Sequence, residues 1–99
     1  MRKIDIIAKK IEGLKPILKE QFKVESIGIF GSYTKGTQRK DSDIDILVEF
    51  EESADLSLLD FIKLENYLSE ILELKVDLVE KTALKPRIGM HILEEVIRL

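Results

Sequence analysis

The sequence contains no cysteine among its 99 residues. Disulfide bonds, zinc–thiolate sites and thiol catalysis are therefore excluded. No apolar run approaches the roughly 20 residues that a membrane-spanning helix needs, and the first residues lack the apolar core of a signal peptide. These features predict a cytoplasmic protein.

An excess of positive charge is also missing. The 16 Lys and Arg residues are outnumbered by 19 Asp and Glu residues, which leaves a formal net charge of −3. A general nucleic-acid-binding protein would show a basic face, so direct nucleic-acid binding is not expected. With 44% apolar and 35% charged residues the chain is globular, and its length suits one small domain over residues 1–99.

The spacing of apolar residues predicts an α/β (α+β) domain in the order helix, strand, strand, helix, strand, helix. We expect helices over residues 4–22, 56–72 and 82–99, and strands over 24–30, 43–50 and 74–80. Gly13 and Pro16 predict a break or kink in the first helix. Thr82 is a candidate N-cap for the last helix, with Pro86 in its first turn. The fold expected is a small three-stranded sheet covered by helices.

The same periodicity predicts which side chains face the core. For the helices these are Ile4, Ile7, Ala8, Ile11, Leu14 and Leu18, then Leu59, Ile62, Leu68, Ile71 and Leu72, and finally Ile88, Ile92, Val96 and Leu99. For the strands they are Ile44, Ile46, Val48 and Phe50, and then Leu74, Val76 and Leu78. The opposite strand faces carry Asp43, Asp45, Leu47 and Glu49, and Lys75, Asp77 and Val79.

The segment after the first strand has the composition of a phosphate-binding turn. Gly31 allows the backbone to approach a phosphate closely, and Ser32 offers a hydroxyl donor beside backbone N–H groups. Gly36 gives the loop a second flexible point. Positive charge that suits a polyphosphate comes from Lys35, Arg39 and Lys40.

Two carboxylates open the next strand. Asp43 and Asp45 are two residues apart, so their Cα atoms should lie about 6.5–7 Å apart with both side chains on one face. Carboxylates placed in this way can share Mg²⁺ ions, and a pair of such ions is a common device for nucleotidyl transfer. If the strand that carries Asp77 lies next to this one, its carboxylate joins the pair as a metal ligand or proton acceptor.

The combination of Gly31-Ser32, Asp43-Ile44-Asp45 and Asp77 resembles the DNA polymerase beta-type nucleotidyltransferase superfamily. The chain is most similar to the minimal nucleotidyltransferases (MNT) of this superfamily, both in its small size and in the segment GSYTKGTQRKDSDIDILVEF. The resemblance covers most of the chain and implies the nucleotidyltransferase fold.

The resemblance also implies a role for each matching residue. Gly31 and Ser32 would hold the triphosphate tail of ATP, Asp43 and Asp45 would bind two Mg²⁺ ions, and Asp77 would complete the metal site and help to deprotonate the acceptor. AMP would be transferred and pyrophosphate released. Many minimal members act as antitoxins of a HEPN-type ribonuclease toxin, and some add AMP to a tyrosine of that toxin. The expected partner is therefore a separate HEPN protein, in a homo- or hetero-oligomer.

Several residues of the chain also have interpretations that involve no nucleotidyl transfer. Asp41, Asp43, Asp45 and Glu52 mimic a calcium loop, but Ile46 stands where that loop needs glycine. His91 is expected to be structural. Tyr33 either stacks on a ligand or covers the loop, and the sequence leaves both open.

Two other functions stay open beside AMP transfer to a toxin. The protein can neutralise a toxin by contact alone, or it can modify a small molecule. The second is disfavoured because 99 residues leave little room for an added acceptor-binding domain.

Overall fold

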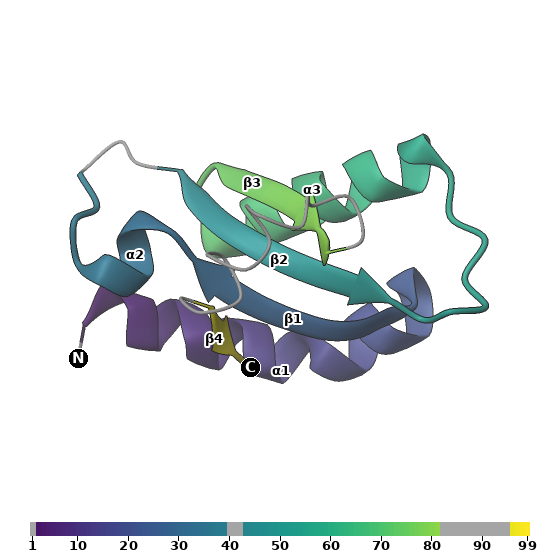
Figure 1. Ribbon diagram of the computed structural model, residues 1–99, viewed down its shortest axis with the longest axis horizontal. Coiled ribbons are helices and arrows are strands. Elements are labelled where there is room, and N and C mark those ends of the chain that lie inside the picture. The colour runs from purple at the N-terminus through teal and green to yellow at the C-terminus, as the bar shows by residue number, and fades with distance from the viewer. Residues whose placement is uncertain (1, 40–42, 82–95) are drawn as a thin grey trace.

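The computed structural model describes residues 2–39, 43–81 and 96–99. Its elements in chain order are α1 (Lys3–Phe22), β1 (Val24–Phe30), α2 (Ser32–Lys35), β2 (Ile44–Phe50), α3 (Leu58–Leu72), β3 (Val76–Glu80) and β4 (Ile97–Arg98). Figure 1 shows the strands side by side, with α2 at one end of the sheet and the connection from β2 to α3 at the other. The predicted α/β class is confirmed.

Within the described residues the sheet has four strands, in the order β3-β2-β1-β4. β1 pairs antiparallel with both β2 and β4, and β2 pairs parallel with β3. The expectation of three strands was therefore wrong.

The fourth strand replaces the end of the predicted last helix. Ile97 and Arg98 pair with β1, and the N–H of Leu99 donates to the carbonyl of Ile27. Gly28 permits this pairing, because a Cβ there would lie 2.6 Å from Val96 Cγ2. The helical spacing of Val96 and Leu99 was overridden by backbone pairing along an open strand edge. Thr82, Pro86, Ile88, His91 and Ile92 lie outside the described residues.

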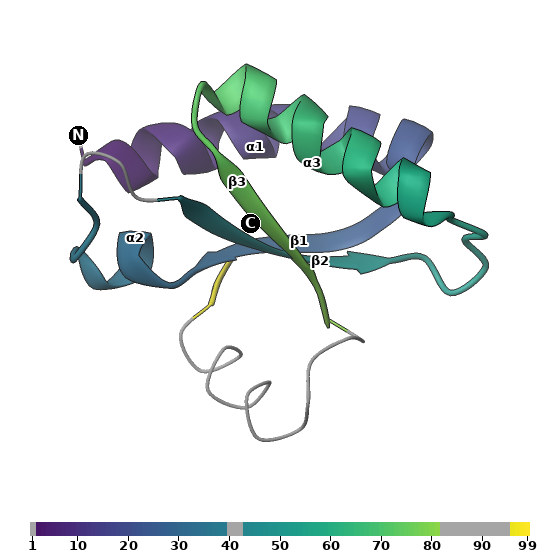
Figure 2. The ribbon, with the colours of Figure 1, turned by 90° about the horizontal axis from the view of Figure 1, so that it is seen from above.

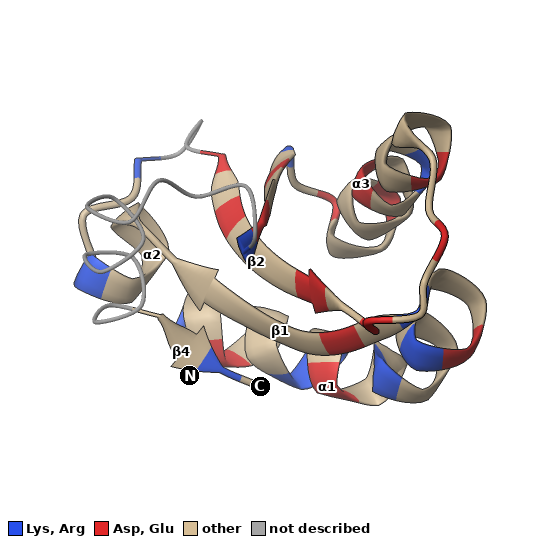
Figure 3. Cartoon of the chain, turned by 45° about the vertical axis from the view of Figure 1, so that its right-hand side comes forward, with Lys and Arg blue, Asp and Glu red and all other residues tan. Residues whose placement is uncertain are grey.

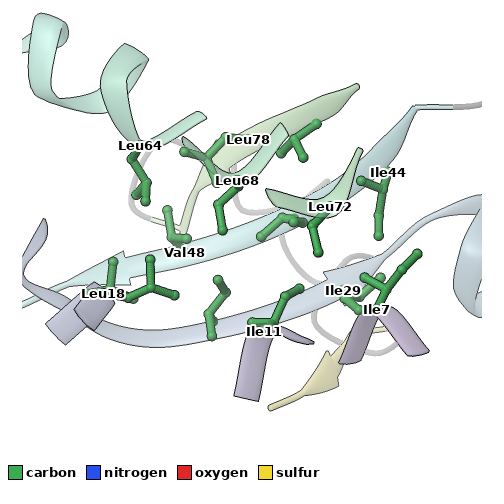
Figure 4. Close-up of a cluster of buried hydrophobic side chains, with 14 of the residues drawn as sticks. Ile7, Ile11, Leu18, Ile29, Ile44, Val48, Leu64, Leu68, Leu72 and Leu78 are labelled. Carbon is green, nitrogen blue, oxygen red and sulfur yellow. The ribbon is translucent and has the colours of Figure 1, made fainter. Parts of the chain in front are cut away.

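Helices α1 and α3 cover the same face of the sheet (Figure 2). Their apolar stripes meet the buried face of the central strands, and the resulting cluster is drawn in Figure 4. The fully buried members are Ile11, Leu18, Ile29, Ile44, Ile46, Val48, Leu64 and Leu68. The predicted alternation of β2 is thus confirmed at its three isoleucine and valine positions.

α1 runs as one continuous helix through Pro16, so the predicted break does not occur. Proline removes one backbone donor and disfavours a helix interior. Here Ile4, Ile7 and Ile11 before Pro16, and Leu18 after it, are all buried in the same core. Their common packing holds both halves of the helix on the sheet.

The core stripe of α3 differs from the one expected. Leu64, Leu68 and Leu72 are buried, whereas Leu59 and Ile62 are exposed. Nine residues separate Leu59 from Leu68, and at about 100° per residue this places the two on opposite sides of the helix.

Candidate active site

The Gly-Ser turn is a tight structure at the end of β1. Gly31 has φ +79°, a conformation that L side chains rarely adopt, and it precedes the single helical turn α2. The Thr34 hydroxyl donates to the Gly31 carbonyl at 2.7 Å, and the N–H of Thr34 donates to the same oxygen at 3.1 Å. Gly36 closes the turn with φ +71°. The backbone of this turn is therefore fixed by its own hydrogen bonds.

Gly31 lies directly against the Asp45 carboxylate. A Cβ at Gly31 would overlap Asp45 Oδ2 and come within 3.0 Å of Asp45 Cγ. The preceding residue, Phe30, is the register partner of Asp45 across the antiparallel pair of β1 and β2. Sheet register thus brings the predicted phosphate turn and the predicted metal ligand into contact.

Asp77 completes the acidic face. It is the register partner of Asp45 across the parallel strands β2 and β3, and its charge acts on the Asp45 carboxyl group. The sequence left open whether the two strands are adjacent, and the sheet order shows that they are. Figure 3 shows acidic segments gathered at the start of β2.

Two side chains of α3 hold β3 on either side of Asp77. The Val76 N–H donates to Ser69 Oγ at 3.1 Å, and the Leu78 N–H donates to Glu65 Oε2 at 3.0 Å. β3 is an edge strand, so these N–H groups would otherwise lack partners in the sheet. Sequence reasoning missed both residues, because nothing in a helical pattern shows which polar side chain reaches a strand edge.

Asp43 lies beside a cation that sequence reasoning also missed as a site residue. Lys75 Nζ is 4.0 Å from Asp43 Oδ2, and the Ile44 N–H donates to the Lys75 carbonyl at 2.9 Å. The signal was available, since Lys75 and Asp77 share a strand face by alternation. An exposed pair of this length is weak, so Lys75 can leave Asp43 at little cost.

Asp45 is the acid of this site whose ionisation is disfavoured by its surroundings. The pKa of Asp45 is raised from 3.8 to about 6 by burial first, then by the charge of Asp77, by the hydrogen bond to Asp77 and by the charge of Asp43. Like charges and desolvation both disfavour the ionised form. A proton or a cation at this point relieves the repulsion.

The donor set fits a hard divalent cation, because Mg²⁺ prefers carboxylate oxygens supplemented by water and phosphate. Asp45 and Asp77 could supply ligands from adjacent strands, and Asp43 lies two residues before Asp45 in the chain. Within residues 2–39, 43–81 and 96–99, no three acidic or histidine side chains already converge as a finished metal cluster. The geometry therefore supplies a contacting pair and one nearby acid.

The other predicted residues are placed less informatively. Lys35 ends α2, and Arg39 follows in the loop, both exposed; Lys40 and Asp41 lie outside the described residues. Tyr33 is 2% exposed and belongs to the core cluster. This burial favours the interpretation in which its ring covers the loop over the one in which it stacks on a ligand. The calcium-loop alternative is wrong, because residues 44–50 form a regular strand.

Fold and site together define a nucleotidyltransferase: a Gly-Ser turn against an acidic pair on adjacent strands of a small mixed sheet. The family model described as "Nucleotidyltransferase domain" matches residues 11–99. The chain therefore belongs to the nucleotidyltransferase domain family, and the predictions of fold and enzyme class are confirmed.

Relatives and solved structures place it among the minimal members. It is 54% identical over 80 residues to protein adenylyltransferase MntA of Thermococcus cleftensis, covering 81% of this chain and 79% of that protein. It is 51% identical over 98 residues to a Methanocaldococcus jannaschii protein, provisionally named protein adenylyltransferase MJ0128, covering 98% of each.

Two solved structures agree. One, provisionally named a minimal nucleotidyltransferase, superposes with a TM-score of 0.78 at 34% identity, covering 100% of this chain and 97% of that one. The other is a toxin–antitoxin complex with AMP-PNP, with a TM-score of 0.73 at 30% identity, covering 91% of this chain and 69% of that one.

Among the described residues, none of the helices has both the length and the apolar character needed to span a membrane.

Proposed function

We propose that this protein transfers AMP from ATP to a hydroxyl group of a partner protein, a HEPN-type toxin, and acts as its antitoxin. The observation that carries the proposal is the contact of Gly31 with Asp45, which in turn pairs with Asp77. The names of the relatives support protein adenylylation, and the complex with AMP-PNP supports ATP as the nucleotide.

Each residue has a definite task in this proposal. Gly31 and Ser32 hold the triphosphate through close backbone approach and a hydroxyl donor, and Lys35 and Arg39 add positive charge. Asp43, Asp45 and Asp77 hold two Mg²⁺ ions, which when bound would neutralise charge on the phosphates and leaving group.

The bond changes follow from this placement. The acceptor oxygen forms a bond to the α-phosphorus, the bond between that phosphorus and the bridging oxygen breaks, and pyrophosphate leaves with the electron pair. The proton of the acceptor hydroxyl passes to Asp77, the most exposed acid on this face. We expect a tyrosine as acceptor.

The direct test combines purified protein, Mg²⁺, ATP labelled in the α-phosphate and the HEPN protein encoded beside it. Label should appear on the HEPN protein and be lost with Asp43→Asn/Asp45→Asn. The label should also be lost when the acceptor tyrosine is changed to phenylalanine. Absence of transfer by the wild-type protein would exclude adenylylation.

Neutralisation by contact alone is the alternative, and it has its own test. If Asp77→Asn abolishes label transfer yet still protects cells from the toxin, then binding is sufficient. If protection is lost while the complex still forms, then catalysis is required.

A further inference from the structure

A second concave feature lies at the far end of the sheet from the acids. It is a groove of about 690 Å³ between the end of β2, the connection to α3, the first turns of α3 and the end of β3. Its apolar lining consists of Phe50, Ala54, Leu56, Leu58, Phe61, Leu78 and Val79. The rings of Phe50 and Phe61 meet edge to face with centroids 6.4 Å apart. Groove volume and lining suit apolar anchor side chains.

The groove shares no lining residue with the candidate active site, although Leu78 of the groove directly follows Asp77 in β3. Asp45 and Phe50 are five residues apart on β2, which corresponds to about 17 Å along the strand. Figure 1 shows α2 and the β2–α3 connection at opposite ends of the sheet. A molecule in the groove would therefore leave the acids free for nucleotide.

Large apolar side chains continue from the groove onto the surface. Leu58, which lines it, is 75% exposed, and its neighbours Leu59 and Ile62 are 61% and 41% exposed. Three such residues on the first turns of one helix are more than the scattered exposure that any surface shows. Leu58 belongs both to the groove lining and to this exposed helix surface.

Among the described residues, the charged side chains that line the groove are all acidic: Glu51, Glu52 and Glu80. The ion pairs found among residues 2–39, 43–81 and 96–99 include neither Glu51 nor Glu52. The nearby N-terminus of α3 is already satisfied, because Ser57 and Asp60 cap it reciprocally. The part of the rim that the structure describes therefore favours a cation over a phosphate.

We propose that this groove docks a basic amphipathic helix of a partner protein. Its apolar side chains would pack against the paired rings of Phe50 and Phe61, and its Lys or Arg residues would pair with Glu51 and Glu52. A helix laid in an apolar groove with flanking charge pairs is a recurrent recognition mode. A second copy of this chain is disfavoured, because each copy carries a net charge of −3 and the same acidic rim.

The test uses two synthetic helical peptides of about 14 residues with the same leucine stripe, one filled with lysine and the other with glutamate. Fluorescence anisotropy gives the affinity, and amide chemical shifts locate the site. The lysine peptide should shift residues 50–58 and 78–79, and the glutamate peptide should bind at least about tenfold more weakly.

Variants separate the groove from general charge effects. Leu58→Lys should lower the affinity for the lysine peptide about tenfold. Ile17→Lys makes the same charge change at an exposed site on α1 and should leave that affinity unchanged. Asp45→Asn should bind the peptide like the wild-type protein, so the result is independent of AMP transfer. Equal binding of both peptides, shifts elsewhere, or self-association that shifts the same residues would overturn the proposal.

Discussion

Asp45 of β2 lies directly opposite Asp77 of β3 in the register of the two parallel strands, and the Asp77 charge acts on the Asp45 carboxyl group. Two acids on adjacent parallel strands in register destabilise the metal-free fold unless a proton or cation lies between them. The site is therefore arranged for charge that a ligand brings.

The first prediction concerns pH. Between the ordinary pKa of 3.8 and the folded-state pKa of about 6, the native protein keeps the Asp45 proton that the unfolded chain has released. With a metal chelator present, the free energy of unfolding should therefore fall as the pH rises from 4 to 6. The expected decrease is about 1–2 kcal/mol after allowance for solvent screening. Urea unfolding at a series of pH values measures it.

Asp45→Asn supplies the control for that pH dependence. The free energy of unfolding of the variant should change little between pH 4 and 6. At pH 7.5 the variant should be more stable than the wild-type protein. Adding Mg²⁺ should stabilise the wild-type protein and not the variant. A slope that is unchanged in Asp45→Asn would assign the pH dependence to another group.

Gly31→Ala should damage both fold and activity. The new methyl group would overlap the Asp45 carboxylate in a backbone conformation that already disfavours alanine, so we expect a loss of about 2–4 kcal/mol. Thermal unfolding and label transfer measure the two effects. Gly13→Ala is the matched control: it lies in α1 with nothing within 4 Å of the new Cβ, and should stabilise by about 0.5–1 kcal/mol.

Glu65→Ala should act on Asp77 from outside the site. It removes the acceptor of the Leu78 N–H at the edge of β3, which should cost about 1–3 kcal/mol and lower the rate of AMP transfer. Glu65→Gln retains an oxygen acceptor and should restore most of both properties. If Ala and Gln variants behave alike, the charge of Glu65 and not its hydrogen bond is what β3 requires.

Lys75→Gln should leave stability within about 0.5 kcal/mol, because its pair with Asp43 is exposed. Freed from that competitor, Asp43 should bind cation more readily, so the Mg²⁺ concentration for half-maximal AMP transfer should fall about two- to fivefold. Titration of activity with Mg²⁺ at saturating ATP tests this. A rise in the Mg²⁺ requirement would instead place Lys75 on the bound phosphates.

Much of the architecture could be predicted because it depends on local chemistry. The apolar run 24–30 is β1 with the same bounds, and alternation placed Ile44, Ile46 and Val48 in the core with Asp45 on the other face. The roles of Gly31, Ser32, Lys35, Arg39 and the three acids stay proposals. Leu59 was misassigned although its spacing from Leu68 was readable in the sequence.

Tertiary structure decided what depends on residues far apart in the chain. Backbone pairing between residues 28–29 and 97–98 converted an expected helix end into β4. Sheet register brought Asp77 onto Asp45 and placed Glu65 and Ser69 at the edge of β3. The sequence determined which residue types alternate and turn, because periodicity and backbone freedom are local. Only the folded sheet determined which of them touch, because strand register is set by distant partners competing for the same backbone hydrogen bonds.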